Sequence, residues 1–185
     1  MNKTLLFVFA LLIGTITMNA QESRYGVRIG ANLSSISSDD ITGDLDKSRI
    51  GVVVGFLADF ALTEKLRLQP EFQYSGQGNK DRDLRVNYLQ VPILLKYNIT
   101  DLFNVQLGPQ AGIKIWEWED NQANVVDFGT FDFAAVAGIG VNITDNFFVD
   151  LRYAFGLSNV FDEDGSAIEL DGNSRNIQLS VGYRL

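Results

Sequence analysis

The clearest structural pattern in this chain is Phe147-Phe148-Val149-Asp150-Leu151-Arg152-Tyr153-Ala154-Phe155-Gly156. Every second residue of the stretch, starting at Phe147, is large and apolar, whereas Asp150 and Arg152 fall between these positions. Successive side chains of a β-strand point to opposite faces of its sheet. The alternation therefore predicts a strand with one apolar face and one polar face.

Seven further stretches alternate in the same way, so the eight together predict an all-β protein. We expect strands at residues 24–33, 50–62, 66–75, 88–99, 103–116, 131–143, 147–157 and 175–185. Ordinary strands have about five or six residues, whereas about nine to eleven tilted residues cross a bilayer. Most of the expected strands have the longer, membrane-spanning length. After the first twenty residues, no apolar run is long enough for a spanning helix.

The connections between these strands alternate between short and long. Three are tight turns of similar sequence, Leu62-Thr63-Glu64-Lys65, Ile99-Thr100-Asp101-Leu102 and Ile143-Thr144-Asp145-Asn146. Longer polar segments lie between them, at residues 34–49, 76–87, 117–130 and 158–174. Short turns at one end and long loops at the other are typical of bacterial outer-membrane barrels, whose turns face the periplasm.

The polar face of the strands carries both charges and glycines. Its charged residues are Arg28, Asp59, Arg67, Glu71, Lys96, Lys114, Asp132, Asp150, Arg152 and Arg184. Its glycines are Gly26, Gly30, Gly51, Gly55, Gly108, Gly112, Gly138, Gly140, Gly156 and Gly182. Glycine weakens a water-exposed strand, but inside a narrow barrel it leaves room for long polar side chains. We therefore predict an eight-stranded antiparallel up-and-down transmembrane barrel with its polar face inward and its apolar face in lipid.

The ten inward charges allow two interpretations of the lumen. They form a network of ion pairs in a filled interior, or they line a narrow channel for small solutes. The first is favoured because eight strands enclose a space just wide enough for side chains to fill it. A soluble, exported ligand-binding barrel is a third alternative, although its apolar face would point inward.

The long loops are rich in acidic residues and are candidates for contacting a protein partner or an ion. The positions singled out are Asp39, Asp40, Glu117, Trp118, Asp162 and Asp164. None of the acidic runs has the ligand spacing of an EF-hand calcium loop. Solvated loop surface is the simpler interpretation, and Trp118 is expected to anchor the membrane interface.

The N-terminal residues have the features of a signal peptide. Lys3 precedes an apolar run at residues 5–16, and Ala20 supplies a small residue at the expected cleavage point. We expect a signal peptide at residues 1–20 and a single barrel domain at residues 21–185, exported to the outer membrane.

The composition excludes several functions. The chain has no cysteine and no histidine, so disulfides, thiolate metal sites and histidine-based catalysis are excluded. We expect no enzymatic activity, no cofactor and no metal site. The formal net charge of −8 argues against nucleic acid as a partner.

One segment identifies a family. The run Tyr88-Leu89-Gln90-Val91-Pro92-Ile93-Leu94-Leu95-Lys96-Tyr97, with Gly108-Pro109-Gln110-Ala111-Gly112 and Asp150-Leu151-Arg152-Tyr153, resembles the outer-membrane β-barrel proteins of Bacteroidota often called PorT-like. The resemblance implies an eight-stranded barrel in outer-membrane lipid, inserted by the outer-membrane assembly machinery. Most such proteins have no assigned activity, and one branch assists a secretion apparatus.

Overall fold

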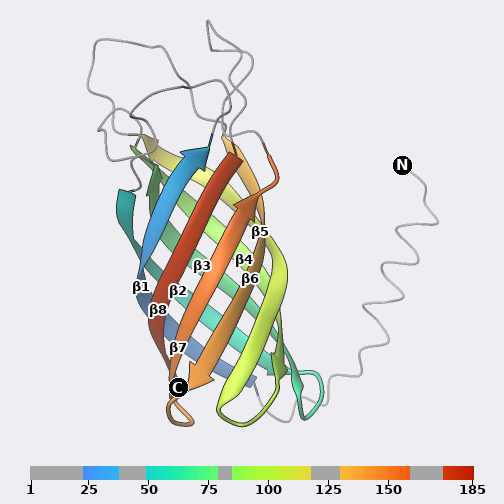
Figure 1. Cartoon of the computed structure of the whole chain (residues 1–185). Helices are drawn as coiled ribbons and strands as arrows, with labels where there is room; N and C mark the ends of the chain where they lie inside the picture. The colour runs from blue at the N-terminus through green and yellow to red at the C-terminus, as the bar shows by residue number, and fades with distance from the viewer. Residues whose placement is uncertain (1–22, 38–48, 79–84, 118–129, 159–172) are drawn as a thin grey trace, which may run out of the picture.

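Eight strands close into one barrel in the computed structural model, which describes residues 23–37, 49–78, 85–117, 130–158 and 173–185. The strands are β1 Ser23–Ser37, β2 Arg49–Ala61, β3 Leu66–Gly78, β4 Arg85–Asn98, β5 Phe103–Glu117, β6 Phe131–Asn142, β7 Phe147–Gly156 and β8 Asn173–Arg184. Each strand pairs antiparallel with its sequence neighbours, and β1 pairs with β8 to close the barrel (Figure 1). The predicted up-and-down topology is confirmed. No helix within the described ranges is long and apolar enough to cross a membrane.

The strand bounds differ from the predicted ones mainly at the loop end of the barrel. There β1 continues to Ser37, β3 continues to Gly78 and β4 begins at Arg85. Backbone pairing extends these strands beyond the last alternating residue, since Ser37 still faces Asn173 and Gly78 still faces Arg85. Apolar and polar residues alternate only where one face of a strand contacts lipid. Backbone hydrogen bonds continue beyond that region as long as a neighbouring strand is available.

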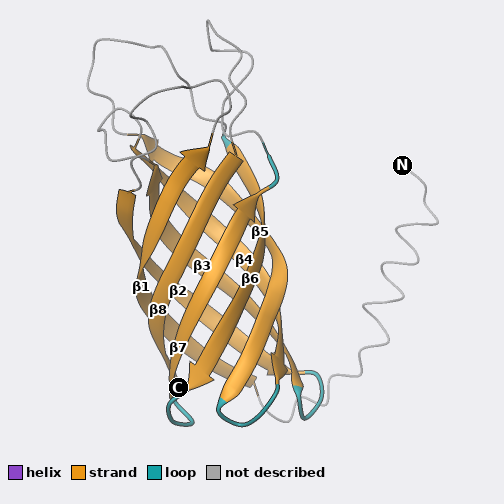
Figure 2. Ribbon diagram, viewed as in Figure 1, coloured by secondary structure: helices purple, strands orange, loops and turns teal. Residues whose placement is uncertain are grey.

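The three short connections share one geometry, as their common sequence predicts. The hydroxyl oxygens of Thr63, Thr100 and Thr144 accept hydrogen bonds from the backbone N–H groups three residues later, at 2.9, 3.0 and 2.9 Å. Such side-chain to backbone bonds stabilise tight turns. All three turns lie at the same end of the barrel, here called the turn end (Figure 2).

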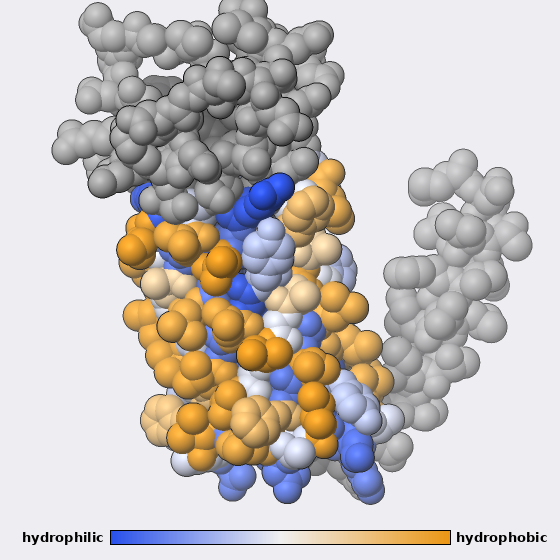
Figure 3. Space-filling view, viewed as in Figure 1, coloured by the Kyte–Doolittle hydropathy of each residue, from blue (hydrophilic) through white to orange (hydrophobic). Residues whose placement is uncertain are grey.

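The outside of the barrel is a continuous apolar surface. Along β7, Phe147, Leu151 and Phe155 are exposed, while Asp150 and Arg152 are buried. The other strands alternate in the same sense over their central parts, and apolar side chains dominate the visible face (Figure 3). A soluble protein rarely exposes an apolar patch larger than a few hundred Å², so this surface requires lipid around it.

Glycines lie beside the largest inward side chains, as the sequence predicts. The register sets Arg28 between Gly55 on β2 and Gly182 on β8. Arg152 is opposite Gly138, and a methyl group at Gly138 would approach the Arg152 side chain to 2.8 Å. The absence of a side chain at Gly138 therefore gives Arg152 its space, whereas a Cβ atom at Gly55 would meet Gln73 and one at Gly182 would meet Phe148.

The inward face is less polar than the sequence pattern suggests. Leu94, Ala134, Val136 and Ala154 form a buried apolar cluster inside the barrel, and Phe148 is completely buried. Small apolar side chains fill the part of the lumen where no ion pair reaches, because protein interiors are close-packed.

The Phe148 ring depends on Gly182, since a Cβ atom at that position would overlap the ring. We predict that Gly182→Ala destabilises the barrel by about 1–3 kcal/mol, the usual effect of overpacking. Thermal unfolding in detergent measures the change. The double variant Gly182→Ala with Phe148→Leu is expected to regain part of the loss, and Val181→Ala on the lipid face is a control. A melt for Gly182→Ala equal to that of the wild type would contradict the predicted packing.

Candidate functional site

The centre of the lumen is blocked by an ion-pair layer built around Glu71 of β3. Arg28 of β1 donates from Nη1 to Glu71 Oε2 at 2.6 Å. Arg152 of β7 donates from Nη1 to Oε2 and from Nη2 to Oε1 of the same carboxylate, both at 2.8 Å. Two parallel N–H···O bonds between arginine and a carboxylate fix orientation as well as supplying energy.

A second carboxylate neutralises the layer. Asp150 accepts a hydrogen bond from Arg152 Nη2 at 2.9 Å, and Gln106 of β5 donates to its other oxygen at 2.7 Å. The Glu71 carboxylate also accepts from Gln69, and Arg28 donates to Ser180 of β8. Buried charges need partners of opposite sign. Two arginines and two carboxylates meet that requirement within one cross-section of the barrel. These four residues are called the central layer.

A second polar layer lies below it, at the turn end. Asp59 of β2 pairs with Arg67 Nε at 2.6 Å and more loosely with Arg184 Nε at 3.5 Å. Lys96 donates to Gln69 Oε1 at 2.9 Å. The centroid of the Phe148 ring lies 5.5 Å from Lys96 Nζ and 4.4 Å from the Arg184 guanidinium carbon. Such cation–π contacts favour a cation over an aromatic face.

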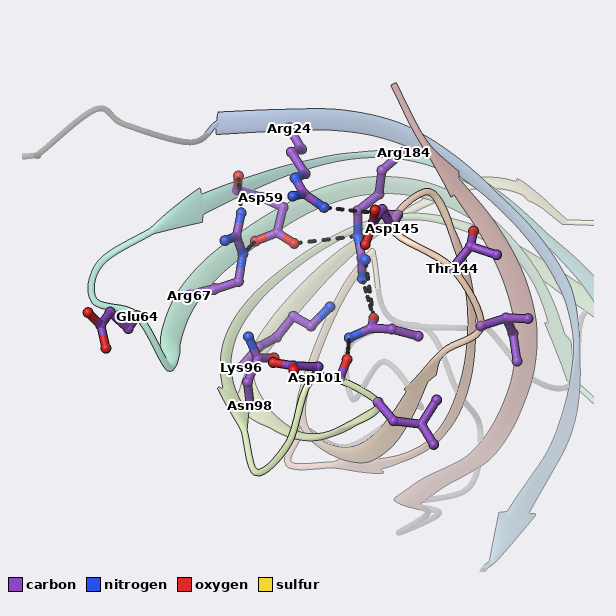
Figure 4. A pocket seen from close by; sticks show the side chains of 13 residues that line it. Arg24, Asp59, Glu64, Arg67, Lys96, Asn98, Asp101, Thr144, Asp145 and Arg184 are labelled. Atoms are coloured by element: carbon purple, nitrogen blue, oxygen red, sulfur yellow. Dashed lines mark hydrogen bonds and ion pairs between the residues drawn. The ribbon is translucent and has the colours of Figure 1, made fainter.

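A recess of about 450 Å³ opens from this layer at the turn end (Figure 4). It is called the turn-end recess. Its lining residues are Arg24, Asp59, Glu64, Arg67, Lys96, Asn98, Asp101, Leu102, Asn142, Ile143, Thr144, Asp145 and Arg184. The recess has the size of a small-molecule binding site.

The loop half of the lumen is lined mainly by amides. Gln73 donates to Gln90 at 3.1 Å, and Asn32 donates to Ser75 Oγ at 2.8 Å. The side-chain nitrogen and oxygen of Asn176 are buried and make no hydrogen bond to the described part of the chain. Buried polar groups of this kind are usually satisfied by ordered water.

The structure places all ten predicted inward charges in the lumen, in three groups. The central layer contains Arg28, Glu71, Asp150 and Arg152, and the turn-end layer contains Asp59, Arg67, Lys96 and Arg184. Lys114 and Asp132 lie apart from both, near the loop end. The sequence does not reveal which charges pair, because strands of very different sequence position meet across the interior.

Phe148 is the principal residue that sequence reasoning missed. It occupies an inward position, next to the outward Phe147, and so departs from the polar pattern of its face. An aromatic residue out of phase with the alternation is the signal that marks it. Asn142, which accepts from both Arg184 Nη atoms at 3.1 and 3.2 Å, was also missed.

Most of the candidate residues in the long loops lie outside the part of the chain that the structure describes. Asp39, Asp40, Trp118, Asp162 and Asp164 lie outside the described residues. Glu117 ends β5, where its backbone pairs with Val86. Within the described ranges, no group of three or more histidine, cysteine, aspartate or glutamate residues could hold a metal ion.

These features define a class of protein. A closed antiparallel barrel with an apolar exterior, a polar interior, short turns at one end and long connections at the other is a small outer-membrane barrel. The family model of the outer membrane protein beta-barrel domain matches residues 19–162, so the chain belongs to that family. The protein is therefore an outer-membrane protein, and in barrels of this class the short turns face the periplasm.

Solved structures share the fold at low sequence identity. Neisserial surface protein A matches with a TM-score of 0.59 and 13% identity, covering 89% of this chain and 99% of that one. Ail, the attachment invasion locus protein of Yersinia pestis, matches with a TM-score of 0.53 and 17% identity, with the same coverage. Ail has also been solved in complex with the heparin analogue sucrose octasulfate. A comparison with curated proteins found no significant match.

The central layer predicts the effect of removing its shared carboxylate. Glu71→Gln keeps the side-chain shape but leaves Arg28 and Arg152 with insufficient negative charge. Breaking a buried ion pair by removing one partner costs about 3–5 kcal/mol. We expect a correspondingly lower unfolding temperature in detergent. The same substitution at the exposed turn residue Glu64 is the matched control and should change stability by less than about 0.5 kcal/mol. Equal melts for the two variants would show that the layer does not stabilise the barrel.

Proposed function

We propose that this protein is a non-conducting outer-membrane barrel whose role is structural or partner-binding, exercised through its acidic extracellular loops. The observation that supports it is the central layer, in which Arg28, Glu71 and Arg152 bridge β1, β3 and β7 across the lumen. Each of these three residues is at most 3% exposed. A solute would have to displace buried, paired charges to pass.

The turn-end layer adds a second obstacle. Phe148 is fully buried and lies against Lys96 and Arg184. An ion moving along the barrel axis would require both layers to open. Each layer is held by several ion pairs and hydrogen bonds that share residues. The closed interior leaves the extracellular loops as the part of the protein best suited to contact a protein partner.

The loop sequences suggest the chemistry of a partner. The acidic positions Asp39, Asp40, Asp162 and Asp164 belong to these loops. Ail, a structural neighbour, has been solved with a sulfated heparin analogue, but acidic loops would repel such a ligand. We propose a partner with a basic surface, because complementary charge speeds association and suppresses wrong partners. Calcium held by the same carboxylates is an alternative that titration followed by thermal melting would test.

The finer family assignment is also a proposal. The segment Tyr88–Tyr97, on which the PorT-like resemblance rests, occupies most of β4 and contributes both lipid-facing Ile93 and inward Lys96. Membership in that group would make an accessory role in a secretion apparatus an alternative function. Crosslinking in native membranes, followed by identification of the attached proteins, tests this alternative. Insertion by the outer-membrane assembly machinery and the absence of enzymatic activity remain proposals of the same kind.

Conductance in planar bilayers distinguishes the proposed role from a narrow channel. We expect no discrete current steps from the purified wild-type protein. The double variant Phe148→Ala with Arg152→Ala removes one blocking side chain from each layer and is expected to pass small ions. Reproducible steps from the wild-type protein would contradict a closed lumen and favour the channel.

Neutralising the fourth loop tests the partner-binding part of the proposal. Replacing Asp162 and Asp164 with Asn is expected to weaken association with a crosslinked partner on intact cells, most strongly at low salt, since salt screens surface charge. Asp145→Asn, in a periplasmic turn, is the matched control. Proteins that crosslink to the wild type and to Asp145→Asn but not to the loop variant are the expected partners. Identical crosslinked products for all three proteins would contradict a role for these loop charges.

A further inference from the structure

The turn-end recess contains buried positive charge that the carboxylates around it do not neutralise. Arg67, Lys96 and Arg184 lie in its wall, with Asp59 as the one buried carboxylate among its lining residues (Figure 4). The six basic and four acidic residues of the lumen leave an excess of two positive charges. The central layer contains two residues of each sign and Lys114 with Asp132 one of each, so the excess lies in the turn-end layer. The recess lining also includes Arg24, with Glu64, Asp101 and Asp145 as its other acidic residues.

Two of its cations lack a hydrogen-bonded carboxylate within the described part of the chain. Arg184 directs both Nη atoms to the neutral oxygen of Asn142, and its buried Nε makes no hydrogen bond and lies 3.5 Å from Asp59. Lys96 donates to the neutral Gln69. The two residues are only 5% and 1% exposed. Burying a charge is costly unless it is both paired and hydrogen-bonded.

The acidic residues at the mouth of the recess do not resolve this imbalance. Glu64, Asp101 and Asp145 are all exposed on the turns, where water and salt screen their charge. Asp101 and Asp145 contact the wall through their backbone carbonyls, which accept from Asn142 at 2.9 Å and Arg24 at 3.1 Å. These exposed carboxylates would disfavour a polyanion at the entrance but would leave a single, compact negative group able to enter.

We propose that the turn-end recess binds the carboxylate group of a small periplasmic molecule. Arginine presents parallel N–H donors that match the two oxygens of a carboxylate. In this structure Arg184 donates from both Nη atoms to the neutral amide oxygen of Asn142. A bound carboxylate would replace these bonds with charge-assisted ones. Lys96 Nζ, 5.5 Å from the Phe148 ring centroid, supplies a second cation. The recess volume of about 450 Å³ accommodates more than the carboxylate itself. The ligand is a free organic acid or the C-terminus of a short peptide, which share this group. The proposal does not depend on the role of the extracellular loops.

Calorimetric titration of the detergent-solubilised full barrel tests the proposal with three probes: acetate, trialanine with a free carboxylate, and trialanine amide. We expect trialanine to bind and its amide to bind at least tenfold more weakly. Acetate as tight as trialanine would identify small organic acids as the ligand class, whereas tighter trialanine would identify peptide C-termini. Failure of both carboxylates to bind at millimolar concentration, or equal binding of the amide, would overturn the proposal.

Two variants connect binding to the recess. Lys96→Met keeps the length of the side chain and removes its charge, and it is expected to weaken trialanine binding at least tenfold. Its unfolding temperature without ligand should equal or exceed that of the wild type, because the lost charge is buried and its hydrogen bond goes to the neutral Gln69 and not to a carboxylate. Lys65→Met, on the exposed β2–β3 turn and outside the recess lining, is the matched control and should bind as the wild type does. Unchanged binding by Lys96→Met would overturn the proposal, and Arg184→Gln provides an independent test of the same site.

Discussion

The narrow interior of an eight-stranded barrel is the constraint on which the rest of this structure depends. Eight strands leave room for side chains and little else, so every inward residue must fit beside those on the neighbouring strands. Arg152 extends inward because Gly138 is opposite, and Phe148 does so because Gly182 is opposite. The glycines and the long polar residues are therefore two parts of one packing arrangement.

The same confinement determines how the charges are arranged. Arginines held inside the barrel need carboxylates close by, and Glu71 with Asp150 supplies them at the centre. Toward the periplasm the arrangement changes, since Asp59 is shared between Arg67 and Arg184, and Lys96 bonds to an amide. The Phe148 ring contacts two of these cations, Lys96 and Arg184. The lumen thus contains two adjacent regions. The central layer closes the barrel and stabilises it, and the turn-end recess beside it carries an excess of buried positive charge.

Much of the fold could be predicted from the sequence because lipid imposes a simple rule on it. A residue such as Leu151, which faces lipid, must be apolar, and its neighbours Asp150 and Arg152 must point away from lipid. The alternation of apolar and polar residues therefore predicts which face of each strand contacts the membrane. The pairing of Arg152 with Glu71 could not be predicted, since it joins positions 81 residues apart. The inward Phe148 was missed because periodicity reports which face a residue occupies and not what fills the space there. The extended loop ends of β1, β3 and β4 were missed because backbone pairing there is not accompanied by contact with lipid.

The polar face of this barrel points inward and the apolar face points into lipid, and spin labels along β5 can measure this orientation. The chain has no native cysteine, so single cysteines at successive positions from Phe103 to Ile113 can each carry one label in a lipid bilayer. We predict that collision with dissolved oxygen alternates with period two, high at positions such as Leu107, which is 64% exposed, and low at Gln106, which is 3% exposed. Absence of the alternation, or alternation in the opposite phase, would contradict the account.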